Sequence, residues 1–507
     1  MNKNLILFFG ASASGGLCIA AFPGSPFPML AWICMVPWMI SLRHAKPFYA
    51  AVSGLVVGCL YAMPCTWNGI YTAAKTLSDD PVKAGVFTIL FFIPYFIPFA
   101  VIGIYSAVSE LTGIRRAVIG SAIWVATMYA MPSVFPVTPG LMLHVFPLSI
   151  QLADVGGVPL VNFILFLINF LIAEIFYQIL KHRRPFKELG YLLIIIAIIA
   201  GYGWIRLTTF QSDGTARKIN VALIQPNLPR GVNEIGLIRD NRIQVISALE
   251  MTRRLLKTNK IDLAVFPETS VAAPCGESGL VFRKLSVVAK ETGVSFLYQC
   301  LDCKESSCYN AARMIFPNEK SPELYRKRAL IPFLETPPTG GFYSLLTGLA
   351  PVKRHFQTGT EKVIFQMEQG IRIMPLICYD VHFPELVREG EIGDVIAVLA
   401  NDQTFGKSRI GYLDYAMNIF RAVEIRRPLL RVTNTGPSAI IQASGLTVPG
   451  TLTQTYKPEA RAAVLHIPDE QTFYARYGDL FLYFLYCLFL WKLIISILRY
   501  KGGTSGQ

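Results

Sequence analysis

A mostly apolar run that ends abruptly in a thiol occupies residues 371–380, which read IRIMPLICYD. Its first seven residues predict a buried strand, and Cys378 lies where that strand ends. A thiol at the end of a buried strand, followed by backbone amides that can bind an oxyanion, is arranged like an activated nucleophile. A buried structural cysteine fits the same local pattern, so the choice between the two depends on the surrounding sequence.

Two other segments carry residues suited to the same chemistry. Residues 262–266 predict a strand that runs into Pro267 and Glu268, and a partly desolvated carboxylate there has a raised pKa and suits general-base work. Lys327 lies in a basic cluster before an apolar run and Glu335, where a cation can stabilise an oxyanion. Taken singly, a solvated turn glutamate and a surface lysine are the more common explanations of Glu268 and Lys327.

The region around these motifs has the pattern of an α/β domain. Charge rises between residue 217 and about residue 467, and short strands rich in β-branched residues alternate with amphipathic segments. We expect strands at residues 219–225, 262–266, 294–299, 312–316, 371–377, 395–400 and 429–433, and helices at residues 239–258 and 413–426. This alternation predicts a layered α/β domain whose functional residues lie on loops after strand ends.

The rest of the chain is too apolar for an ordinary soluble protein, since 53% of its 507 residues are hydrophobic. Apolar stretches long enough to cross a hydrocarbon core of ~30 Å occupy residues 5–22, 27–42, 49–67, 84–108, 117–135, 158–180, 189–205 and 480–498. We therefore expect a membrane α-helical bundle of about eight spans. Seven spans lie in residues 1–206, the catalytic domain in residues 217–467, the last helix in residues 478–499, and a disordered tail in residues 500–507.

Charge between the spans predicts their orientation. With the N-terminus in the cytoplasm, the inside segments contain eleven Lys or Arg residues and the short outside loops contain two, Lys75 and Lys83. The positive-inside rule then places both termini in the cytoplasm and the α/β domain in the periplasm of a bacterial inner membrane. The net charge of +14 comes mostly from these short clusters, so it argues for membrane insertion and against nucleic-acid binding.

The motifs together resemble one branch of the nitrilase superfamily, the apolipoprotein N-acyltransferases. The resemblance is carried by residues 266–269 (FPET), by Lys327 with residues 332–335 (PFLE), by residues 378–380 (CYD) and by residues 384–388 (PELVR). Further similar segments are residues 221–225 with Asn227, 401–406, 421–431, 434–436 and 474–479. The resemblance covers the soluble domain by its motifs, and the membrane part mainly by its topology.

The resemblance implies an αββα sandwich and a Glu-Lys-Cys triad. Glu268 would be the base, Lys327 the oxyanion partner and Cys378 the nucleophile, with Glu335, Tyr379 and Asp380 as supporting residues. It further implies a ping-pong reaction: Cys378 takes an acyl chain from a phospholipid, usually phosphatidylethanolamine, and passes it to the amine of a diacylglyceryl-cysteine lipoprotein. We expect membrane lipid as the surroundings, no cofactor, no metal and a monomer.

Several positions depart from the pattern of this branch. Asp380 stands where Glu is usual, Thr404 and Glu234 stand where Trp is expected, Leu334 replaces a Gly, and Tyr412 and Asp414 occupy positions where His is common. The triad residues are all retained. Aromatic residues at such positions would normally face acyl chains, so a paralogue with an altered acyl donor or acceptor, or with weakened activity, stays open.

Two other functions compete with acyl transfer. In a membrane-tethered carbon-nitrogen hydrolase of the amidase or nitrilase type, water would resolve the thioester in place of an amine. In a non-catalytic scaffold or transporter, ionisable residues would be expected deep in the spans. The only ionisable residues within the predicted spans are essentially Glu174 and Lys492. Both are near span ends, which disfavours a transporter.

Four cysteines in the α/β region could form disulfides or bind a metal. Cys275, Cys300, Cys303 and Cys308 have no histidine at a spacing that suits zinc, and an oxidising compartment favours disulfides. We rank one disulfide first, free thiols second and a metal site third. The spacing does not identify the bonded pair.

Overall fold

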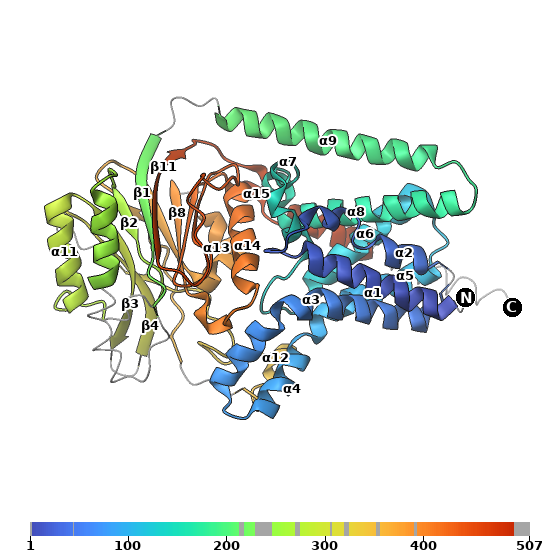
Figure 1. The fold of residues 1–507 in the computed structure, drawn as a ribbon, viewed down its shortest axis with the longest axis horizontal. Coiled ribbons are helices and arrows are strands. Elements are labelled where there is room, and N and C mark those ends of the chain that lie inside the picture. Colours follow the sequence, from blue (N-terminus) through green and yellow to red (C-terminus); the bar gives the residue numbers. More distant parts are fainter. Residues whose placement is uncertain are drawn as a thin grey trace. The chain divides into compact units, whose positions relative to one another are not determined.

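The computed structural model describes residues 3–43, 45–211, 217–228, 246–268, 274–304, 307–318, 324–350, 355–389 and 393–490. The chain divides into two compact units. The first consists of Met1–Trp67, Ile89–Ile205 and Tyr477–Gln507, and the second of Asn68–Thr88 and Arg206–Arg476. The described part of the first unit is helical, and the second is mainly α/β (Figure 1). The predicted tail at residues 500–507 lies outside the described residues.

Apolar helices make up the N-terminal part of the chain. They are α1 (Lys3–Ala21), α2 (Val36–Ser41), α3 (Pro47–Leu77), α4 (Pro81–Phe91), α5 (Ile93–Val108), α6 (Gly113–Ala130), α7 (Pro147–Ile150), α8 (Ala153–Leu180) and α9 (Phe186–Gln211). Such helices satisfy every backbone polar group internally, which a lipid environment requires.

Membrane-spanning length is reached by five segments within the described residues: Lys3–Ala21, Pro47–Leu77, Pro81–Val108, Ala153–Leu180 and Phe186–Thr209. Two shorter apolar helices occupy Pro28–Ser41 and Leu480–Leu490. The second covers residues 480–490 of the last predicted span, and residues 491–498 of that span lie outside the described residues. The predicted span at residues 117–135 coincides mostly with α6, which is outside the five. A helical membrane bundle is therefore confirmed, with a number of spans roughly consistent with the expected eight.

Two buried polar side chains of α8, Asn169 and Glu174, are paired within the first unit. The side chain of Asn169 on α8 accepts a hydrogen bond from the backbone N–H of Met35 at 2.9 Å and donates to the carbonyl oxygen of Ala31 at 3.1 Å. Glu174, one of the two ionisable residues noted within the predicted spans, forms ion pairs with Arg43 and Arg116. These contacts give the buried carboxylate of Glu174 a structural role.

Two β-sheets form the centre of the second unit. The first has the strand order β11-β1-β2-β3-β4-β5, and the second has the order β10-β9-β8-β7-β6. Their bounds are β1 (Arg217–Gln225), β2 (Leu263–Val265), β3 (Ser295–Lys304), β4 (Ser307–Ile315), β5 (Tyr325–Arg326), β6 (Phe365–Gln366), β7 (Arg372–Ile377), β8 (Val395–Ala400), β9 (Leu429–Thr433), β10 (Ala439–Ile441) and β11 (Glu459–Ile467). Strands β1, β2 and β3 are parallel, as are β7, β8 and β9.

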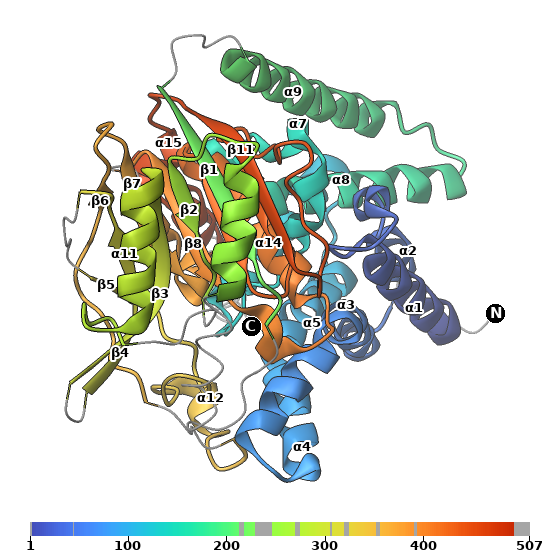
Figure 2. The ribbon, with the colours of Figure 1, turned by 60° about the vertical axis from the view of Figure 1, so that its left-hand side comes forward.

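Helices cover the outer face of each sheet. Helix α11 (Leu280–Thr292) and the helical residues 246–256 pack on the first sheet, where Leu285 and Val288 join a core with Phe296 of β3. Helix α14 (Ile410–Ile425), which is buried except at Tyr412, covers the second sheet. Figure 1 shows the four layers nearly edge-on, and Figure 2 shows α11 in front of the first sheet. The predicted αββα sandwich is confirmed, because the inner faces of the two sheets pack on each other and helices cover the outer faces.

Candidate active site

The three residues proposed for the triad all follow the C-terminal end of a strand. Cys378 comes directly after β7, Lys327 directly after β5, and Glu268 three residues after β2. Loops at strand ends are the usual place for functional side chains in layered α/β folds. The second sheet thus supplies Cys378, and the first sheet supplies Glu268 and Lys327.

Lys327 is almost completely buried, at 1% exposure, between two carboxylates. Its Nζ atom lies 2.8 Å from Oε2 and 2.9 Å from Oε1 of Glu335, and 3.7 Å from Oε1 of Glu268. Burial opposes the charge of Lys327, but the two carboxylates outweigh burial and raise its pKa. The lysine therefore carries a fixed positive charge in a site of low dielectric constant, where charge stabilisation is strongest.

Glu268 combines burial with contacts to the other site residues. Burial raises the pKa of its carboxyl, while the charge of Lys327 and hydrogen bonds from Asn310 and the Cys378 thiol act in the opposite direction. The Asn310 side-chain amide donates to Oε1 of Glu268 at 2.7 Å. A carboxylate with a raised pKa, in contact with a thiol, is suited to accept and return a proton near neutral pH.

Cys378 has an unusual backbone conformation, with φ of 48°. This left-handed region is uncommon for residues other than glycine, and such strain concentrates at functional sites. Burial, followed by the nearby charge of Glu268, raises the pKa of the thiol well above its ordinary value, although the charge of Lys327 opposes this rise. The resting sulfur is therefore a neutral thiol, which needs a base such as Glu268 at the moment of attack.

Asp380 connects the segment of Cys378 to the segment of Lys327. One carboxylate oxygen, Oδ2, accepts hydrogen bonds from the backbone N–H of Ile377 at 2.9 Å and from the Tyr325 hydroxyl at 2.7 Å. The other oxygen, Oδ1, accepts from the backbone N–H groups of Ala329 at 2.7 Å and Arg328 at 3.2 Å. The aspartate thus positions both segments, although its side chain is one methylene shorter than the glutamate usual in the branch.

Tyr379 lies beside Asp380 in η3 (Cys378–His382) and is buried. Its ring packs against the rings of His382 at 5.3 Å and Phe383 at 5.1 Å between centroids. His382 in turn lies 3.2 Å from Asp414, measured from Nε2 to Oδ1. These contacts hold the turn that follows the thiol.

Asn310 on β4 was not predicted from the sequence. Besides its bond to Glu268, its side-chain amide donates to Oε1 of Glu335 at 3.2 Å and accepts from Nε2 of Gln299 at 3.0 Å. It therefore bridges the two carboxylates on either side of Lys327. Asparagine is depleted in strands, so an Asn within an otherwise strand-like segment was the available signal.

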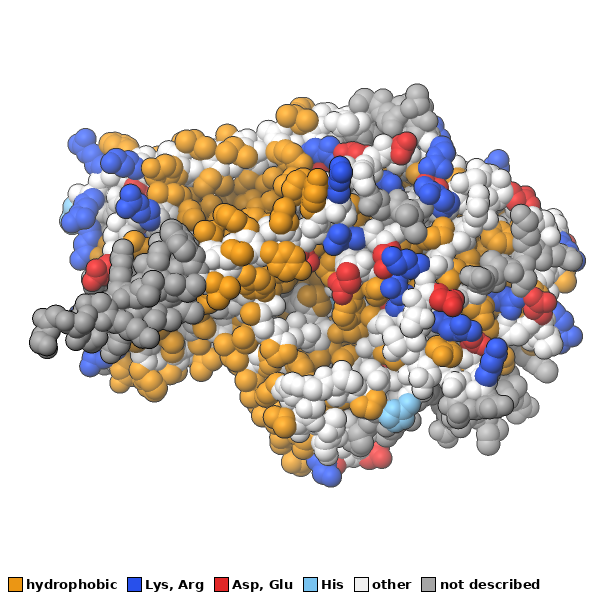
Figure 3. All heavy atoms as spheres, turned by 180° about the vertical axis from the view of Figure 1, so that it is seen from behind, with side chains coloured by type: hydrophobic (Ala, Val, Ile, Leu, Met, Phe, Trp, Pro, Cys, Tyr) orange, Lys and Arg blue, Asp and Glu red, His pale blue; other side chains and the backbone are white. Residues whose placement is uncertain are grey.

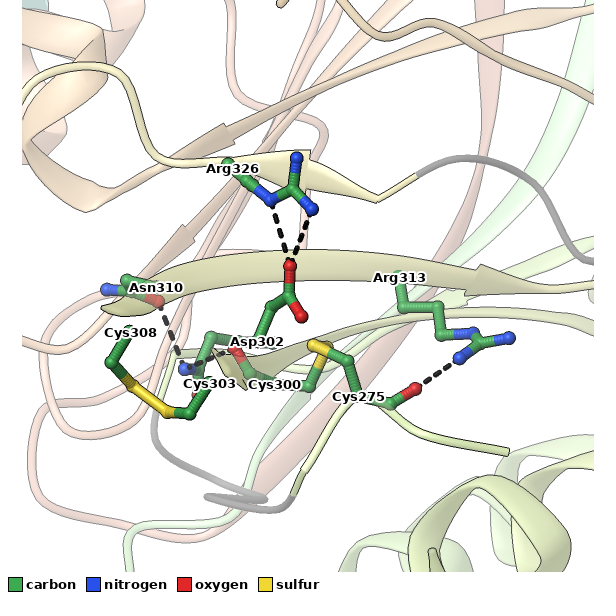
Figure 4. Close-up of a disulfide and its surroundings, with 9 residues drawn as sticks. Cys275, Cys300, Asp302, Cys303, Cys308, Asn310, Arg313 and Arg326 are labelled. Atoms are coloured by element: carbon green, nitrogen blue, oxygen red, sulfur yellow. Dashed lines mark hydrogen bonds and ion pairs between the residues drawn. A yellow bond between two sulfur atoms is a disulfide. The ribbon is translucent and has the colours of Figure 1, made fainter. Parts of the chain in front are cut away.

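Two disulfides lie at the hairpin that carries Asn310, where the sequence predicted one. Cys275 is bonded to Cys300, and Cys303 to Cys308 (Figure 4). The prediction was wrong in number because Cys303 and Cys308 face each other directly in the antiparallel register of β3 and β4, which spacing does not reveal. Among the described residues, no group of three or more His, Cys, Asp or Glu side chains is arranged to hold a metal ion.

Of the other departures from the branch pattern, Asp414 contacts His382 beside the turn of Cys378, and Leu334 directly precedes Glu335. Thr404 is half-buried in η5 (Asp402–Phe405), beside Asp402, whose Oδ2 lies 2.5 Å from Nη2 of Arg431. Glu234 lies outside the described residues. The residues proposed for the reaction lie together within the second unit.

Comparison with known protein families matches both units. A model described as carbon-nitrogen hydrolase matches residues 220–457, and one described as apolipoprotein N-acyltransferase N-terminal domain matches residues 14–171. The apolipoprotein N-acyltransferase of Geobacter metallireducens is 26% identical, over 93% of this chain and 91% of its own length. The enzyme of Chlorobaculum tepidum with the same name is 23% identical, over 93% of this chain and 93% of its own length. That of Nostoc sp. is 26% identical, over 92% of this chain and 94% of its own length. The two domains, in this order and over most of the length, show that the chain belongs to the apolipoprotein N-acyltransferase family.

Proposed function

We propose that this chain moves a fatty acyl chain from a phospholipid to the N-terminal amine of a diacylglyceryl-cysteine lipoprotein, through a thioester on Cys378. The observation that carries the proposal is the buried cluster of Lys327, Glu268 and Glu335 in contact with a neutral thiol. Such a cluster combines a proton acceptor, a fixed cation and a nucleophile, which are the groups that acyl transfer requires.

In the first half-reaction, Glu268 takes the proton of the Cys378 thiol as the sulfur attacks an ester carbonyl carbon of the phospholipid. Lys327 and the backbone N–H of Tyr379 stabilise the oxyanion that forms on the carbonyl oxygen. Collapse of this intermediate breaks the ester bond, and Glu268 returns its proton to the departing oxygen of the lysophospholipid. A positioned general base contributes about 10²–10⁴-fold, and each oxyanion donor about 10²–10³-fold.

In the second half-reaction, the lipoprotein amine attacks the thioester carbonyl carbon and gives up a proton to Glu268. The carbon–sulfur bond then breaks, an amide is released, and Cys378 regains its proton. Glu335 supports both steps by holding Lys327 through two short contacts. Asp380 and Tyr379 support them by holding the turn on which Cys378 lies.

We assign phosphatidylethanolamine as the acyl donor, a diacylated lipoprotein as the acceptor, and the monomer as the working form. The location that fits both substrates is the bacterial inner membrane, with both termini in the cytoplasm and residues 217–467 in the periplasm. The support for this orientation is the ratio of eleven basic residues to two between the short inside and outside segments.

A hydrolase reaction is the second candidate, because the model that matches residues 220–457 describes carbon-nitrogen hydrolases. The two reactions differ in what resolves the thioester. Purified protein incubated with phospholipid and a diacylated lipopeptide should yield a triacylated lipopeptide if an amine is the acceptor. Release of free fatty acid alone, with no triacylated product, would favour the hydrolase.

Intact-mass measurement after exposure to phospholipid tests the nucleophile. We expect one acyl adduct on the wild-type chain, no adduct on Cys378→Ala, and a folded but inactive or stalled Cys378→Ser variant. Cys487→Ala is the matched control, because Cys487 is also a free cysteine and is exposed. Its substitution should leave the acyl adduct unchanged. Full activity in the Cys378→Ala variant would eliminate the proposed mechanism.

A further inference from the structure

A cavity of about 680 Å³ lies within the first unit and is lined by residues at the start of α1, the end of α2 and the start of α3. Three basic side chains, Lys3, Arg43 and Lys46, line it. Among the described residues that line the cavity there is no Asp or Glu. The cavity therefore has a positive potential, which favours an anionic ligand.

The three cations differ in how they are held. Arg43 is fixed from outside the cavity, because it pairs with Glu174 and its guanidinium lies 4.1 Å from the centroid of the Tyr177 ring. Lys3 and Lys46 are exposed, and within the described part of the chain neither forms an ion pair. Two flexible ammonium groups thus lie beside one oriented guanidinium, a combination suited to phosphate oxygens.

The remaining wall of the cavity is apolar. Ile6, Phe9, Ile40 and Tyr49 line it, and Phe9 is 75% exposed. A soluble phosphorylated metabolite would need polar partners for the rest of its structure, whereas acyl chains need only apolar surface. Figure 3 shows a face on which hydrophobic side chains cover a broad area, with Lys and Arg side chains at the left-hand edge of that area and others mixed with Asp and Glu on the right.

Close helix packing shapes this wall. Gly10 lies on the cavity-facing part of α1, where a Cβ atom would be 2.5 Å from Oγ of Ser41 and 2.8 Å from the carbonyl oxygen of Pro37. Only glycine allows α1 to approach α2 this closely. The cavity is therefore part of the packed bundle, and its walls are held by tertiary contacts.

We propose that this cavity binds the phosphate of an anionic phospholipid, with Lys3, Arg43 and Lys46 around the head group and an acyl chain along Ile6 and Phe9. The ligand is proposed as a bound lipid, since none of the lining residues is among those used in the proposed reaction. The inference is independent of the proposed function.

Native mass spectrometry of the full chain in detergent tests this site. The delipidated protein is titrated with diether phosphatidylglycerol, which has no ester carbonyl and cannot acylate Cys378, and separately with inorganic phosphate. The variant Lys3→Ala/Lys46→Ala is compared with Arg183→Ala/Lys187→Ala, which removes two exposed basic residues that do not line the cavity. A second variant, Lys3→Glu/Lys46→Glu, reverses both charges at these exposed positions.

We expect Lys3→Ala/Lys46→Ala to weaken lipid binding about thirtyfold, at roughly tenfold or less per lysine. The charge-reversal variant should weaken it further, and the control should bind like the wild type. Millimolar phosphate should not displace the lipid. Equal weakening in the control, unchanged binding in both cavity variants, or binding of phosphate without lipid would each overturn the assignment.

Discussion

The substitution Asp380→Asn separates positioning from simple stability. Asp380 is fully buried and its two carboxylate oxygens accept four hydrogen bonds, two on each oxygen. Asparagine keeps the shape of the side chain but replaces one oxygen with an amide NH₂ group. Two of the four donors then face another donor and lose their acceptor.

The expected loss of stability follows from this count. A buried donor without an acceptor costs about 1–3 kcal/mol, so two of them predict a loss of about 2–6 kcal/mol. The lower end applies if the amide turns its NH₂ group toward the Tyr325 hydroxyl, which can rotate away. The same change loosens the connection between the turn of Cys378 and the segment of Lys327, and a misplacement of about 1 Å between reacting groups costs on the order of 10²-fold in rate.

Asp394→Asn is the matched control, because Asp394 holds the other end of the same strand. Its Oδ2 accepts a hydrogen bond from the backbone N–H of Arg372, the first residue of β7, at 2.8 Å. Both variants should lower the thermal unfolding temperature in detergent, but only Asp380→Asn should slow acylation of Cys378, measured by the mass of the adduct over time. A folded Asp380→Asn variant with the wild-type rate, or equal slowing in both variants, would refute the positioning role.

Three further outcomes test other parts of the site. Asn310→Ala removes a hydrogen bond that lowers the pKa of Glu268, so the acid limb of the pH–rate profile should move to higher pH; an unmoved limb would contradict this. Lys327→Met leaves Glu268 and Glu335 without their cation, so we expect at least about 10²-fold slower acylation and a loss of about 3–5 kcal/mol in unfolding experiments. Burial disfavours the charge of Asp394, but hydrogen bonds from two arginines outweigh it and lower its pKa from 3.8 to about 2. Because the folded-state pKa is depressed, this stability is present above about pH 4 and lost as the pH falls toward 2, and Asp394→Asn should flatten that part of the stability curve.

Residues with reactive side chains at strand ends were predictable from the sequence. Glu268 and Cys378 follow strands that the sequence predicts, so their chemistry and their place in a layered fold point to the same edge. Lys327 was identified from its basic cluster, and the short strand β5 before it was not predicted. Asn310 was missed because it lies inside a strand and acts only through the carboxylates that it contacts. Asp380 was predicted to support the site, but its four hydrogen bonds depend on where the backbone of residues 325–329 passes.

The pairing of the cysteines was likewise not predictable from the sequence. Composition and compartment favoured disulfides over a metal site, and the pairing required the register of β3 and β4, in which Cys303 and Cys308 are opposite each other. Register is set by the packing of whole strands against the core, so it is not a property of the local spacing.

The order of elements, the membrane-spanning helices and the identity of the reactive groups are local properties of the chain, since they depend on apolar run length, strand periodicity and side-chain chemistry. The hydrogen bonds that tune those groups are not local. Asn310 and Glu268 are 42 residues apart, and Asp380 and Tyr325 are 55 apart. Strand pairing within the first sheet brings Asn310 to Glu268, and the packing of the two sheets brings Asp380 to Tyr325. A shift of one residue in a strand would turn its side chain to the opposite face and break such a contact.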